Sequence, residues 1–546
     1  MLVKNTTIQN RSKQRRLNSE HIIPFQNIRR KEVVDFLQSL CNLNEPKEQI
    51  LFSIGHYLLK GNKNPSVIKF IDEYDYKLIN IKNIPTNEFD LLGSAYQFLN
   101  SKKENLEKGS FYTCSETALD FVNDLDFSHG QTIFDPSCGS GVFLFKSNAS
   151  AEQIFGVDFD PIAIMIAKFN YFIKFPDAKS PNLFCDDFFN WFSFNKQMIF
   201  NYIIGNPPYG ANLNLSKIPT EFISSGESFS YFIEFGYKLL KKDGIMRFLL
   251  PEAILNVKRH ADVRDFMLDK TNIKKIKRYS KKFSGVMSDV YMIELDRNSE
   301  QNLQFIDEIS TTVPKIIYKD FQNHIFVHLT EQDIMIIEKV NNLKKHSLSN
   351  SIFGLGVVTG DNKKKLHTKK IDGSEHIYTG KEVEKYKLLS PKNYLVFDRN
   401  ELQQVAPDEI YRHSKKLVYK TINKFLKVAI DITKSLTSNS ANIIIPKDCG
   451  GLDAYTIMAL LNSNLYSYLH LKLFGGVNKI AKENLIALPF PEICTEKNVI
   501  IKNLVKDVIR NGDDKNLQKY INKNIFKLHD GEIEYINGFI PKNDVI

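Results

Sequence analysis

The sequence predicts a doubly wound α/β sheet between a helical amino-terminal region and a mixed α+β carboxy-terminal domain. From about residue 106 to 300, short apolar runs alternate with helical segments, and several of the runs end at a polar residue. The chain has 546 residues, which is too long for one ordinary domain, and 42% of them are hydrophobic, which is enough for packed cores. We therefore expect three domains, at residues 1–105, 106–300 and 301–546.

The first domain is predicted to be a basic arm followed by helices. Residues 1–20 are polar and rich in Lys and Arg. Between residues 31 and 99 apolar residues recur three or four positions apart, as Val33, Leu37 and Leu40 do. This spacing is typical of amphipathic helices.

In the second domain, four apolar runs each precede a polar residue. The runs at 132–134, 154–157, 183–185 and 203–204 lead to Asp135, Asp158, Asp187 and Asn206, respectively. Two later runs, at 245–250 and 290–295, add further strands. Because the carboxyl ends of parallel strands meet at one edge of a sheet, we expect the four polar residues to converge on one crevice.

Past about residue 301 the alternation of short apolar runs with helical segments ends. Short β-like pieces at 378–380, 394–397, 417–419 and 442–445 mix with helical stretches at 330–340 and 456–474. This mixture predicts a separate α+β domain.

Residues Asn206-Pro207-Pro208-Tyr209 form a loop of unusual stiffness. The two prolines lack amide donors and keep the residues before them out of the helical region. The loop therefore holds carbonyl oxygens, an amide and an aromatic ring in a fixed relation. Such a loop can accept two hydrogen bonds from one planar NH2 group and stack a ring on the same group. A site that methylates an exocyclic amino nitrogen needs this arrangement.

The predicted crevice suits a nucleoside. Residues 135–141 (DPSCGSG) form a glycine loop after the first strand, where the backbone can approach a ligand closely. Asp158 is placed to accept from both hydroxyls of a ribose, and Asp187 with Phe188 is placed to bind an adenine. The loop lacks the third glycine of a dinucleotide site, and the chain has no Gly-Lys-Ser/Thr for a triphosphate. S-adenosylmethionine, a nucleoside with a small charged appendage, fits these features.

These motifs resemble those of DNA adenine-N6 methyltransferases of the gamma arrangement, in the group with a TaqI-like carboxy-terminal specificity domain. Residues 109–113 (GSFYT) resemble the upstream cofactor motif, although Cys114 stands where the family usually has Pro. Residues 206–209 match the family's catalytic motif in full, and residues 231–251 resemble the segment downstream. The resemblance continues over 356–362 (GVVTGDN) and 460–463 (LLNS), in the expected specificity domain.

The resemblance implies a Rossmann-like S-adenosylmethionine-dependent methyltransferase fold and roles for individual residues. The catalytic residues would be Asn206, Pro207, Pro208, Tyr209 and Phe283, the last as a second ring over the target base. The cofactor-binding residues would be Tyr112, Thr113, Asp135, Pro136, Cys138, Gly139, Gly141, Asp158, Phe159, Asp187, Phe188 and Asn206. No metal is expected, because no Cys-x-x-Cys pair or similar cluster is present.

The charge distribution favours a nucleic-acid partner. The formal net charge is +10, and residues 258–282 alone carry ten Lys or Arg against three Asp. We expect double-stranded DNA to contact these basic positions and those of the last domain: Lys258, Arg259, Lys274, Lys275, Lys277, Lys363 and Lys364.

The expected activity is methyl transfer to adenine N6 in a flipped-out base, by the modification enzyme of a restriction-modification system. Cytosine-N4 transfer, a bifunctional restriction enzyme, a modification subunit with a separate specificity protein, protein-glutamine methylation and an RNA substrate are alternatives. A cognate endonuclease is a possible partner. The chain shows no membrane-length apolar run and no signal-peptide core, so we expect a cytoplasmic monomer.

Overall fold

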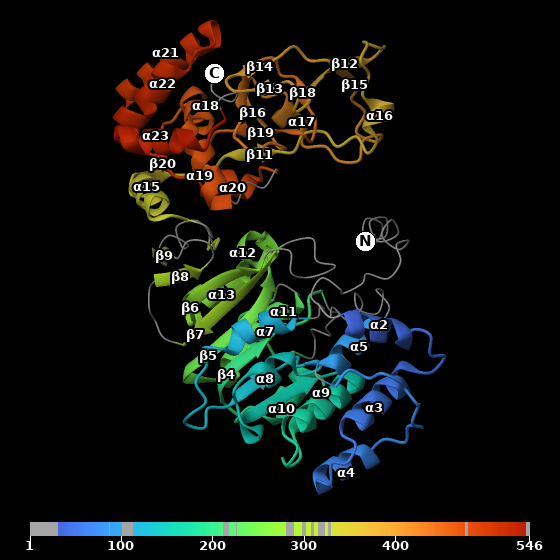
Figure 1. Cartoon of the computed structure of the whole chain (residues 1–546). Helices are drawn as coiled ribbons and strands as arrows, with labels where there is room; N and C mark the ends of the chain where they lie inside the picture. Colours follow the sequence, from blue (N-terminus) through green and yellow to red (C-terminus); the bar gives the residue numbers. More distant parts are fainter. Residues whose placement is uncertain are drawn as a thin grey trace. The chain divides into compact units, whose positions relative to one another are not determined.

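The chain forms two compact units, residues 1–308 and 309–546, in a computed structural model (Figure 1). The structure describes residues 31–86, 88–100, 113–210, 218–224, 227–279, 289–297, 302–306, 311–314, 323–325, 329–474 and 479–541. Within this described part, no helix is long and apolar enough to cross a membrane.

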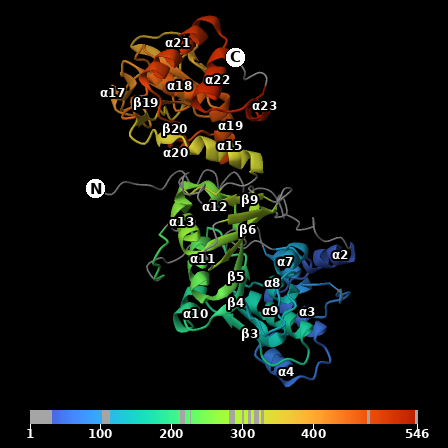
Figure 2. The same ribbon diagram turned by 90° about the vertical axis from the view of Figure 1, so that its left-hand side faces the viewer.

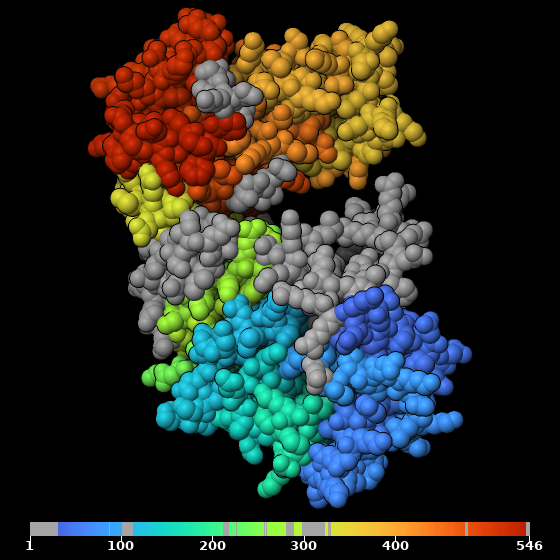
Figure 3. Space-filling model, in the orientation of Figure 1, coloured from blue at the N-terminus to red at the C-terminus, as the bar shows by residue number. Residues whose placement is uncertain are grey.

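The predicted helical region is confirmed. Its helices are α2 (Lys31–Leu40), α3 (Lys47–Leu58), α4 (Pro65–Asp72) and α5 (Leu91–Leu99). They share one hydrophobic core with the helices beside the sheet, and the space-filling view shows the two parts packed together (Figure 3). A Cβ on Gly55 of α3 would lie 2.5 Å from the ring of Phe169, so only glycine allows this approach. The expected boundary at residue 105 therefore does not separate two independently packed units.

The first unit contains a nine-stranded sheet in the order β3-β2-β1-β4-β5-β7-β6-β8-β9. Its strands are β1 (Ile133–Asp135), β2 (Ile154–Asp158), β3 (Asn182–Cys185), β4 (Phe200–Gly205), β5 (Leu240–Pro251), β6 (Asn272–Tyr279), β7 (Val290–Asp296), β8 (Asn302–Ile306) and β9 (Thr311–Pro314). Strands β1 to β5 are parallel, and β7 runs antiparallel to both β5 and β6. All six predicted strands are present.

Helices cover both faces of this sheet (Figure 2). They are α7 (Ser115–Val122), α8 (Val142–Lys146), α9 (Pro161–Lys174), α10 (Phe188–Phe194), α11 (Ser228–Leu239), α12 (Ala253–Asn256) and α13 (Ala261–Lys270), with short 3-10 turns at η1 (Ala151–Gln153) and η3 (Lys258–His260). Ile133 of β1 packs into the core with α7, α8 and α9, while its neighbour Phe134 stacks on Trp191 of α10 on the opposite face. This alternation confirms the doubly wound fold.

The second unit is a mixed α+β domain, as predicted. Its larger sheet has the order β11-β19-β16-β17, and a smaller one has the order β15-β12-β18. The strands are β10 (Lys344–His346), β11 (Ile352–Gly354), β12 (Ser374–Tyr378), β13 (Val383–Glu384), β14 (Lys387–Leu388), β15 (Asn393–Val396), β16 (Lys416–Lys420), β17 (Val428–Asp431), β18 (Leu436–Thr437), β19 (Ala441–Ile445) and β20 (Phe490–Pro491). The helices are α15 (Glu331–Asn341), α16 (Asn362–Lys365), α17 (Asp408–Tyr411), α18 (Ala454–Asn462), α19 (Asn464–Phe474), α20 (Lys482–Ala487), α21 (Thr495–Asn511), α22 (Lys515–Tyr520), η4 (Ile521–Ile525) and α23 (Asp530–Gly538).

The two motifs quoted for this domain have clear structural roles. The amide of Asn462 bonds to both backbone groups of Val428, accepting from its N–H at 2.9 Å and donating to its carbonyl at 2.7 Å. The predicted helix at 456–474 is therefore interrupted at Ser463. Gly356 lies against the carbonyl of Ser438, so closely that a Cβ could not be accommodated. Both motifs stabilise the fold of the second unit.

Candidate active site

The sheet brings the predicted polar residues to one edge. Asp135 ends β1, Asp158 ends β2, Asp187 follows β3 and Asn206 follows β4, and these four strands are parallel neighbours. A Cβ on Gly205 would lie 2.6 Å from Asp135 Oδ1, so the end of β4 lies directly beside the end of β1. The Asn206 loop and the glycine loop therefore adjoin each other.

The glycine loop is shaped for close approach of a ligand. Gly139 and Gly141 have φ values of 52° and 84°, which glycine adopts without strain. A Cβ on Gly139 would meet open space, so this backbone faces the crevice. Cys138 and Pro136 are buried behind it. Burial raises the pKa of the Cys138 thiol well above its usual range, which makes this cysteine a packing residue rather than a nucleophile.

Asp135 carries a buried carboxylate that needs a cation. Its Oδ1 accepts from the Ser137 N–H at 3.0 Å. Among the described residues, neither its Oδ2 nor the Ser137 hydroxyl has a hydrogen-bond partner, although both atoms are buried. Burial, reinforced by the charge of Asp158, raises the pKa of Asp135 well above the usual range of a carboxyl group. An ammonium group on a bound ligand would satisfy both oxygens.

Asp158 joins the two loops that border the crevice. Its Oδ2 accepts from the Gly139 N–H at 2.8 Å, and its Oδ1 accepts from the Asp160 N–H at 2.9 Å. These two bonds fix the carboxylate of Asp158 between the two loops, and its binding of the ribose hydroxyls stays a prediction.

At the end of the crevice predicted to bind adenine, the exposed aromatic ring is that of Phe159, whereas the ring of Phe188 is buried. Phe188 is buried, 3% exposed, and its ring stacks on Phe232 at a centroid distance of 5.0 Å. The neighbouring Phe159 is 54% exposed and follows Asp158 directly. Asp187 caps α10 through Oδ1, which accepts from the Phe189 and Asn190 N–H groups. Phe159 is therefore the accessible ring here, and covering of the base by Phe188 stays a prediction.

The Asn-Pro-Pro-Tyr loop is held at three points by residues far away in the sequence. Asn206 Nδ2 donates to Thr113 Oγ1 at 3.3 Å, which turns the Asn206 carbonyl oxygen away from Thr113. The Ser228 hydroxyl donates to the Pro208 carbonyl. The Tyr209 hydroxyl donates to the Leu249 carbonyl at 2.7 Å, while its ring meets the edge of Phe229. These contacts fix the loop without using its predicted acceptors.

Sequence reasoning missed two of these contacts. Leu249 lies in the apolar run 245–250, which indicated only a strand, and no pattern or motif singled out Ser228. Thr113 was predicted to touch the cofactor, but its bond to Asn206 gives it a second, positional role. Tyr112 and Phe283 lie outside the described residues.

Three basic residues predicted to contact DNA lie on β6 and form ion pairs with nearby aspartates. Lys277 pairs with Asp120 of α7 at 2.6 Å, Lys275 with Asp124 at 3.9 Å, and Lys274 with Asp296 at 3.8 Å. The pairing register places Tyr279 at the edge that carries Asn206, so Lys274 lies toward the opposite edge of the sheet. These ion pairs engage Lys274, Lys275 and Lys277 within the first unit, and their contact with DNA stays a prediction.

Other basic positions stay at exposed sites. Arg259, on η3 just past the end of β5, is 61% exposed and pairs with Glu227 at 3.7 Å. The backbone of Lys258 begins the same turn, but its side chain lies outside the described part of the structure. In the second unit, Lys363 and Lys364 lie on α16, and the Lys364 side chain is 83% exposed.

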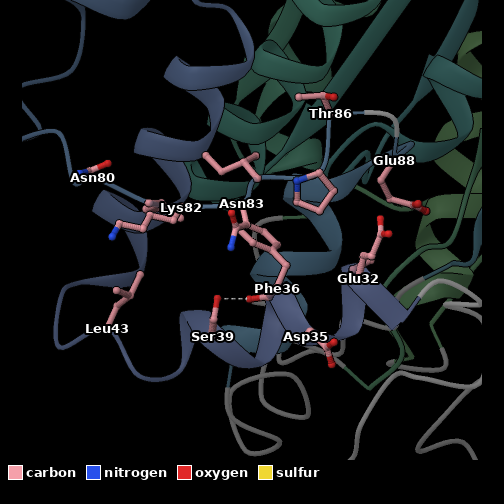
Figure 4. A pocket seen from close by; sticks show the side chains of 14 residues that line it. Glu32, Asp35, Phe36, Ser39, Leu43, Asn80, Lys82, Asn83, Thr86 and Glu88 are labelled. Carbon is pink, nitrogen blue, oxygen red and sulfur yellow. Dashed lines mark hydrogen bonds between the residues drawn. The ribbon is translucent and has the colours of Figure 1, made fainter.

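A separate pocket lies in the helical region. It has a volume of 830 Å³ and is lined by α2 and the segment 80–88, with the carboxylates of Glu32, Asp35 and Glu88 around it (Figure 4). Its lining contains none of the residues predicted for cofactor binding or catalysis, and we assign it no function. Elsewhere in the described part of the chain, no cluster of His, Cys, Asp or Glu is arranged to hold a metal ion.

Two families match the chain in separate stretches. Residues 152–284 match the Eco57I restriction-modification methylase family, and residues 375–490 match the TaqI-like C-terminal specificity domain. The first stretch contains Asp158, Asp187 and the Asn206 loop. The second contains α17 to α20 and most of the strands of the second unit.

Individual proteins are similar over shorter or longer stretches. The type II methyltransferase M.VspI of Vibrio sp. (strain 343) is 26% identical over 307 residues, which are 54% of this chain and 74% of that protein. The type I restriction enzyme MjaIX methylase subunit of Methanocaldococcus jannaschii is 31% identical over 134 residues, 22% of this chain and 23% of that protein. The solved structure of the type IIL restriction-modification enzyme MmeI, determined in complex with DNA, shares the fold with a TM-score of 0.54 at 12% identity, covering 93% of this chain and 91% of that one.

These matches confirm the resemblance predicted from the motifs. The chain is a methyltransferase of the restriction-modification type, with a Rossmann-like catalytic fold and a TaqI-like specificity domain. Its cofactor is S-adenosylmethionine, the methyl donor that this class of enzyme uses. The crevice fits this molecule, because the buried Asp135 matches its ammonium group, and binding of its ribose by Asp158 stays a prediction.

Proposed function

We propose that the chain methylates the N6 amino group of an adenine in duplex DNA. The observation that carries this proposal is the geometry of residues 206–209, a stiff loop that is anchored by Thr113, Ser228 and Leu249 and lies beside the glycine loop. The three anchoring hydrogen bonds use Asn206 Nδ2, the Pro208 carbonyl and the Tyr209 hydroxyl. The Asn206 carbonyl oxygen and the Pro207 carbonyl are then the acceptors for the two N–H bonds of the target amino group.

These two acceptors address the difficulty of the reaction. The lone pair of the adenine amino nitrogen is delocalised into the ring, which makes that nitrogen a poor nucleophile. Two hydrogen bonds accepted by Asn206 and Pro207 favour a tetrahedral nitrogen and localise its lone pair. S-adenosylmethionine supplies an electrophilic sulfonium methyl group when bound. The carbon–nitrogen bond would form as the carbon–sulfur bond breaks, with S-adenosylhomocysteine as the leaving group, and the nitrogen would then lose one proton to solvent. Positioning and electrostatics supply the rate gain, with no covalent intermediate on the enzyme.

The target nitrogen is inaccessible inside a stacked duplex, so the base must turn out of the helix. Unstacking costs a few kcal/mol, and stacking on an aromatic ring returns about 1–3 kcal/mol. Tyr209 is the ring we assign to this contact, because its hydroxyl is fixed by the Leu249 carbonyl and its ring packs perpendicular to that of Phe229. Phe283 stays the predicted second ring.

We further propose that residues 309–546 read the DNA sequence, with Lys363 and Lys364 among the phosphate contacts. The match to a specificity domain and the exposure of α16 support this assignment. A separate endonuclease that cleaves the unmethylated site is the partner expected of a modification enzyme.

Labelled S-adenosylmethionine, assorted genomic duplexes and nucleoside analysis of the product test the proposal. Wild-type protein should yield N6-methyladenine, whereas Asn206→Ala should yield none and still bind the cofactor. N4-methylcytosine as the product would replace adenine by cytosine in the proposal. Label found in protein and in none of the DNAs would reject DNA as the substrate.

A further inference from the structure

Helix α5 belongs to the amino-terminal region, yet its first residues reach the cofactor loop. Asp90, the N-cap of α5, is buried and its Oδ2 accepts from the Ser140 hydroxyl at 2.8 Å. Its Oδ1 accepts from Asn170 Nδ2 at 2.8 Å and from the Gly93 N–H at 3.1 Å. Asn170 Nδ2 also donates to the Ser140 carbonyl at 3.0 Å. One carboxylate therefore links α5, α9 and the glycine loop.

The same helix contacts the second loop of the crevice. Tyr96, six residues further along α5, donates its hydroxyl to Asp160 Oδ2 at 2.5 Å. Asp160 follows β2 and caps α9, because its Oδ1 accepts from the Ile162 N–H at 3.0 Å. α5 thus meets the loop after β1 at one end and the loop after β2 further along.

These contacts close a ring around Asp158. From Asp90 the ring passes to Ser140 and its neighbour Gly139, whose N–H bonds to Asp158 Oδ2. Asp158 Oδ1 accepts from the Asp160 N–H, and the Asp160 side chain returns to Tyr96 on α5. Asp158, the residue predicted to bind the ribose, therefore lies within a hydrogen-bonded circuit. The two outer anchors of this circuit, Asp90 and Tyr96, belong to one helix, α5.

The backbone at Asp90 has an uncommon conformation, which directs its carboxylate toward the glycine loop. Asp90 has φ 52° and ψ 42°, in the left-handed region, where aspartate is tolerated at some cost. Gly93 lies so close to the Asp90 carboxylate that any Cβ at this position would collide with it. The Asp90–Gly93 pair is therefore built to bring this carboxylate onto the glycine loop.

We propose that Asp90 and Tyr96 are positioning residues of the cofactor site: they hold the loops after β1 and β2 at the spacing that S-adenosylmethionine requires. The amino-terminal helices are thus a part of the cofactor site and not a separate appendage. This inference rests on the proposed function only in that the crevice binds S-adenosylmethionine. It is independent of which base is methylated.

The test compares Asp90→Asn and Tyr96→Phe with a matched control, Asn62→Ala. Asparagine tolerates the left-handed region and can cap a helix, but it lacks the charge and one acceptor oxygen. Phenylalanine removes only the hydroxyl that bonds to Asp160. Asn62 joins the same helical region to the sheet-bearing part, through the Pro176 carbonyl at 3.1 Å, away from both crevice loops.

Calorimetric titration with S-adenosylmethionine should give a dissociation constant raised about tenfold for Asp90→Asn and about fivefold for Tyr96→Phe. The double variant should lose less than the product of these factors, because both residues act on one circuit. The KM for the cofactor should rise while kcat at saturating cofactor stays unchanged. Asn62→Ala should bind S-adenosylmethionine with a dissociation constant within twofold of the wild-type value. This should hold even if its melting temperature falls as far as those of Asp90→Asn and Tyr96→Phe.

Three results would overturn the inference. The first is wild-type cofactor affinity in both Asp90→Asn and Tyr96→Phe. The second is an equal loss of affinity in Asn62→Ala at equal melting temperature, which would reduce the effect to general stability. The third is a wild-type protein that binds no S-adenosylmethionine, which would also remove the proposed function. By contrast, a wild-type protein that binds the cofactor and methylates cytosine would change the proposed function and leave this inference standing.

Discussion

The carboxyl group of Asp135 couples cofactor binding to pH. Its pKa lies well above the usual range because the group is buried beside Asp158. In its protonated form it does not attract an ammonium group, so the affinity for S-adenosylmethionine should fall as the pH drops through this raised pKa. Titration from pH 8 to pH 5 in buffers of different ionisation heat should also detect a proton released on binding. Asp135→Asn should bind weakly with little pH dependence, and the same pH slope in both proteins would contradict the assignment.

Thr113 offers a test of how the Asn206 amide is oriented. Thr113→Val keeps the shape of the side chain but cannot accept from Asn206 Nδ2, whereas Thr113→Ser retains the acceptor. One neutral hydrogen bond is worth about 0.5–1.5 kcal/mol, so the single-turnover rate of Thr113→Val should fall up to about tenfold. Its cofactor affinity should stay near the wild-type value, and Thr113→Ser should restore the rate. A loss confined to cofactor affinity would instead support the predicted role in cofactor binding alone.

At this scale the sequence predicted the ends of strands but not the partners of the side chains placed there. Asp135, Asp158 and Asn206 were found because an apolar run ends at each of them, which is a local signal. Ser228, Leu249 and Asp90 meet the site through tertiary packing. Their contacts span 20, 40 and 50 residues, from Pro208, Tyr209 and Ser140, respectively. No local pattern specifies such pairs.

At the scale of elements, β6 shows that the residues of a basic stretch can be paired within the fold. Its buried residues include Ile273, Ile276 and Tyr279, spaced three apart, which resembles one face of a helix. The register shifts between Ile273 and Lys275, which breaks the usual alternation of a strand over the first of these two intervals. Arg264 of α13 is likewise 1% exposed and donates to the carbonyls of Ile254 and Val257. Charge counted along the sequence therefore does not reveal which basic side chains are buried or paired within the fold.

Lysines on β6 and on α16 are expected to respond to substitution in opposite ways, because Lys277 is ion-paired within the fold whereas Lys363 and Lys364 on α16 are exposed. Lys277→Ala on β6 removes the pair with Asp120 and should cost about 1 kcal/mol of stability, measured by denaturant unfolding. It should leave unchanged the slope of log affinity for DNA against log salt concentration. The double variant Lys363→Ala/Lys364→Ala on α16 should leave stability unchanged and reduce that slope by about 1–2.

One outcome for each variant would contradict these expectations. A reduced salt slope in Lys277→Ala, with unaltered stability, would return β6 to the DNA interface. An unaltered slope in the α16 variant would remove Lys363 and Lys364 from it. Asp361→Ala is no suitable control here, because Asp361 caps α16 through the Lys363 and Lys364 N–H groups.

At the scale of the whole molecule, the chain divides into two units where the sequence predicted three domains. The two units divide between Glu308 and Ile309, close to the predicted boundary at residue 301. The boundary at 105 followed a change of pattern from helices to alternating strands. A change of pattern does not reveal whether two segments share a core, and α3 packs on α9 through Gly55 and Phe169. Domain boundaries therefore need the packing of apolar faces as well as their periodicity.

Each unit also carries a buried histidine whose pKa is lowered by burial, and these two residues predict how the molecule responds to acid. Burial lowers the pKa of His260 in the first unit and of His470 in the second to about 4, from an ordinary 6.5. The folded protein keeps both rings neutral, whereas the unfolded chain takes up a proton on each below pH 6.5. The free energy of unfolding should therefore fall as the pH drops from about 6.5 to about 4, by up to about 1.4 kcal/mol per pH unit for each ring.

Differences between variants and wild type isolate this contribution, since Asp135, whose pKa is raised, contributes with the opposite sign. His260→Gln and His470→Gln remove one titrating group each, so thermal unfolding of either variant should depend less steeply on pH over this window. The two losses of slope should add in the double variant, because the residues lie in separate units and share no partner among the described contacts. If the units melt in separate transitions, each substitution should flatten the pH dependence of its own transition only. A wild-type slope in both variants would show that both rings already titrate normally in the folded protein.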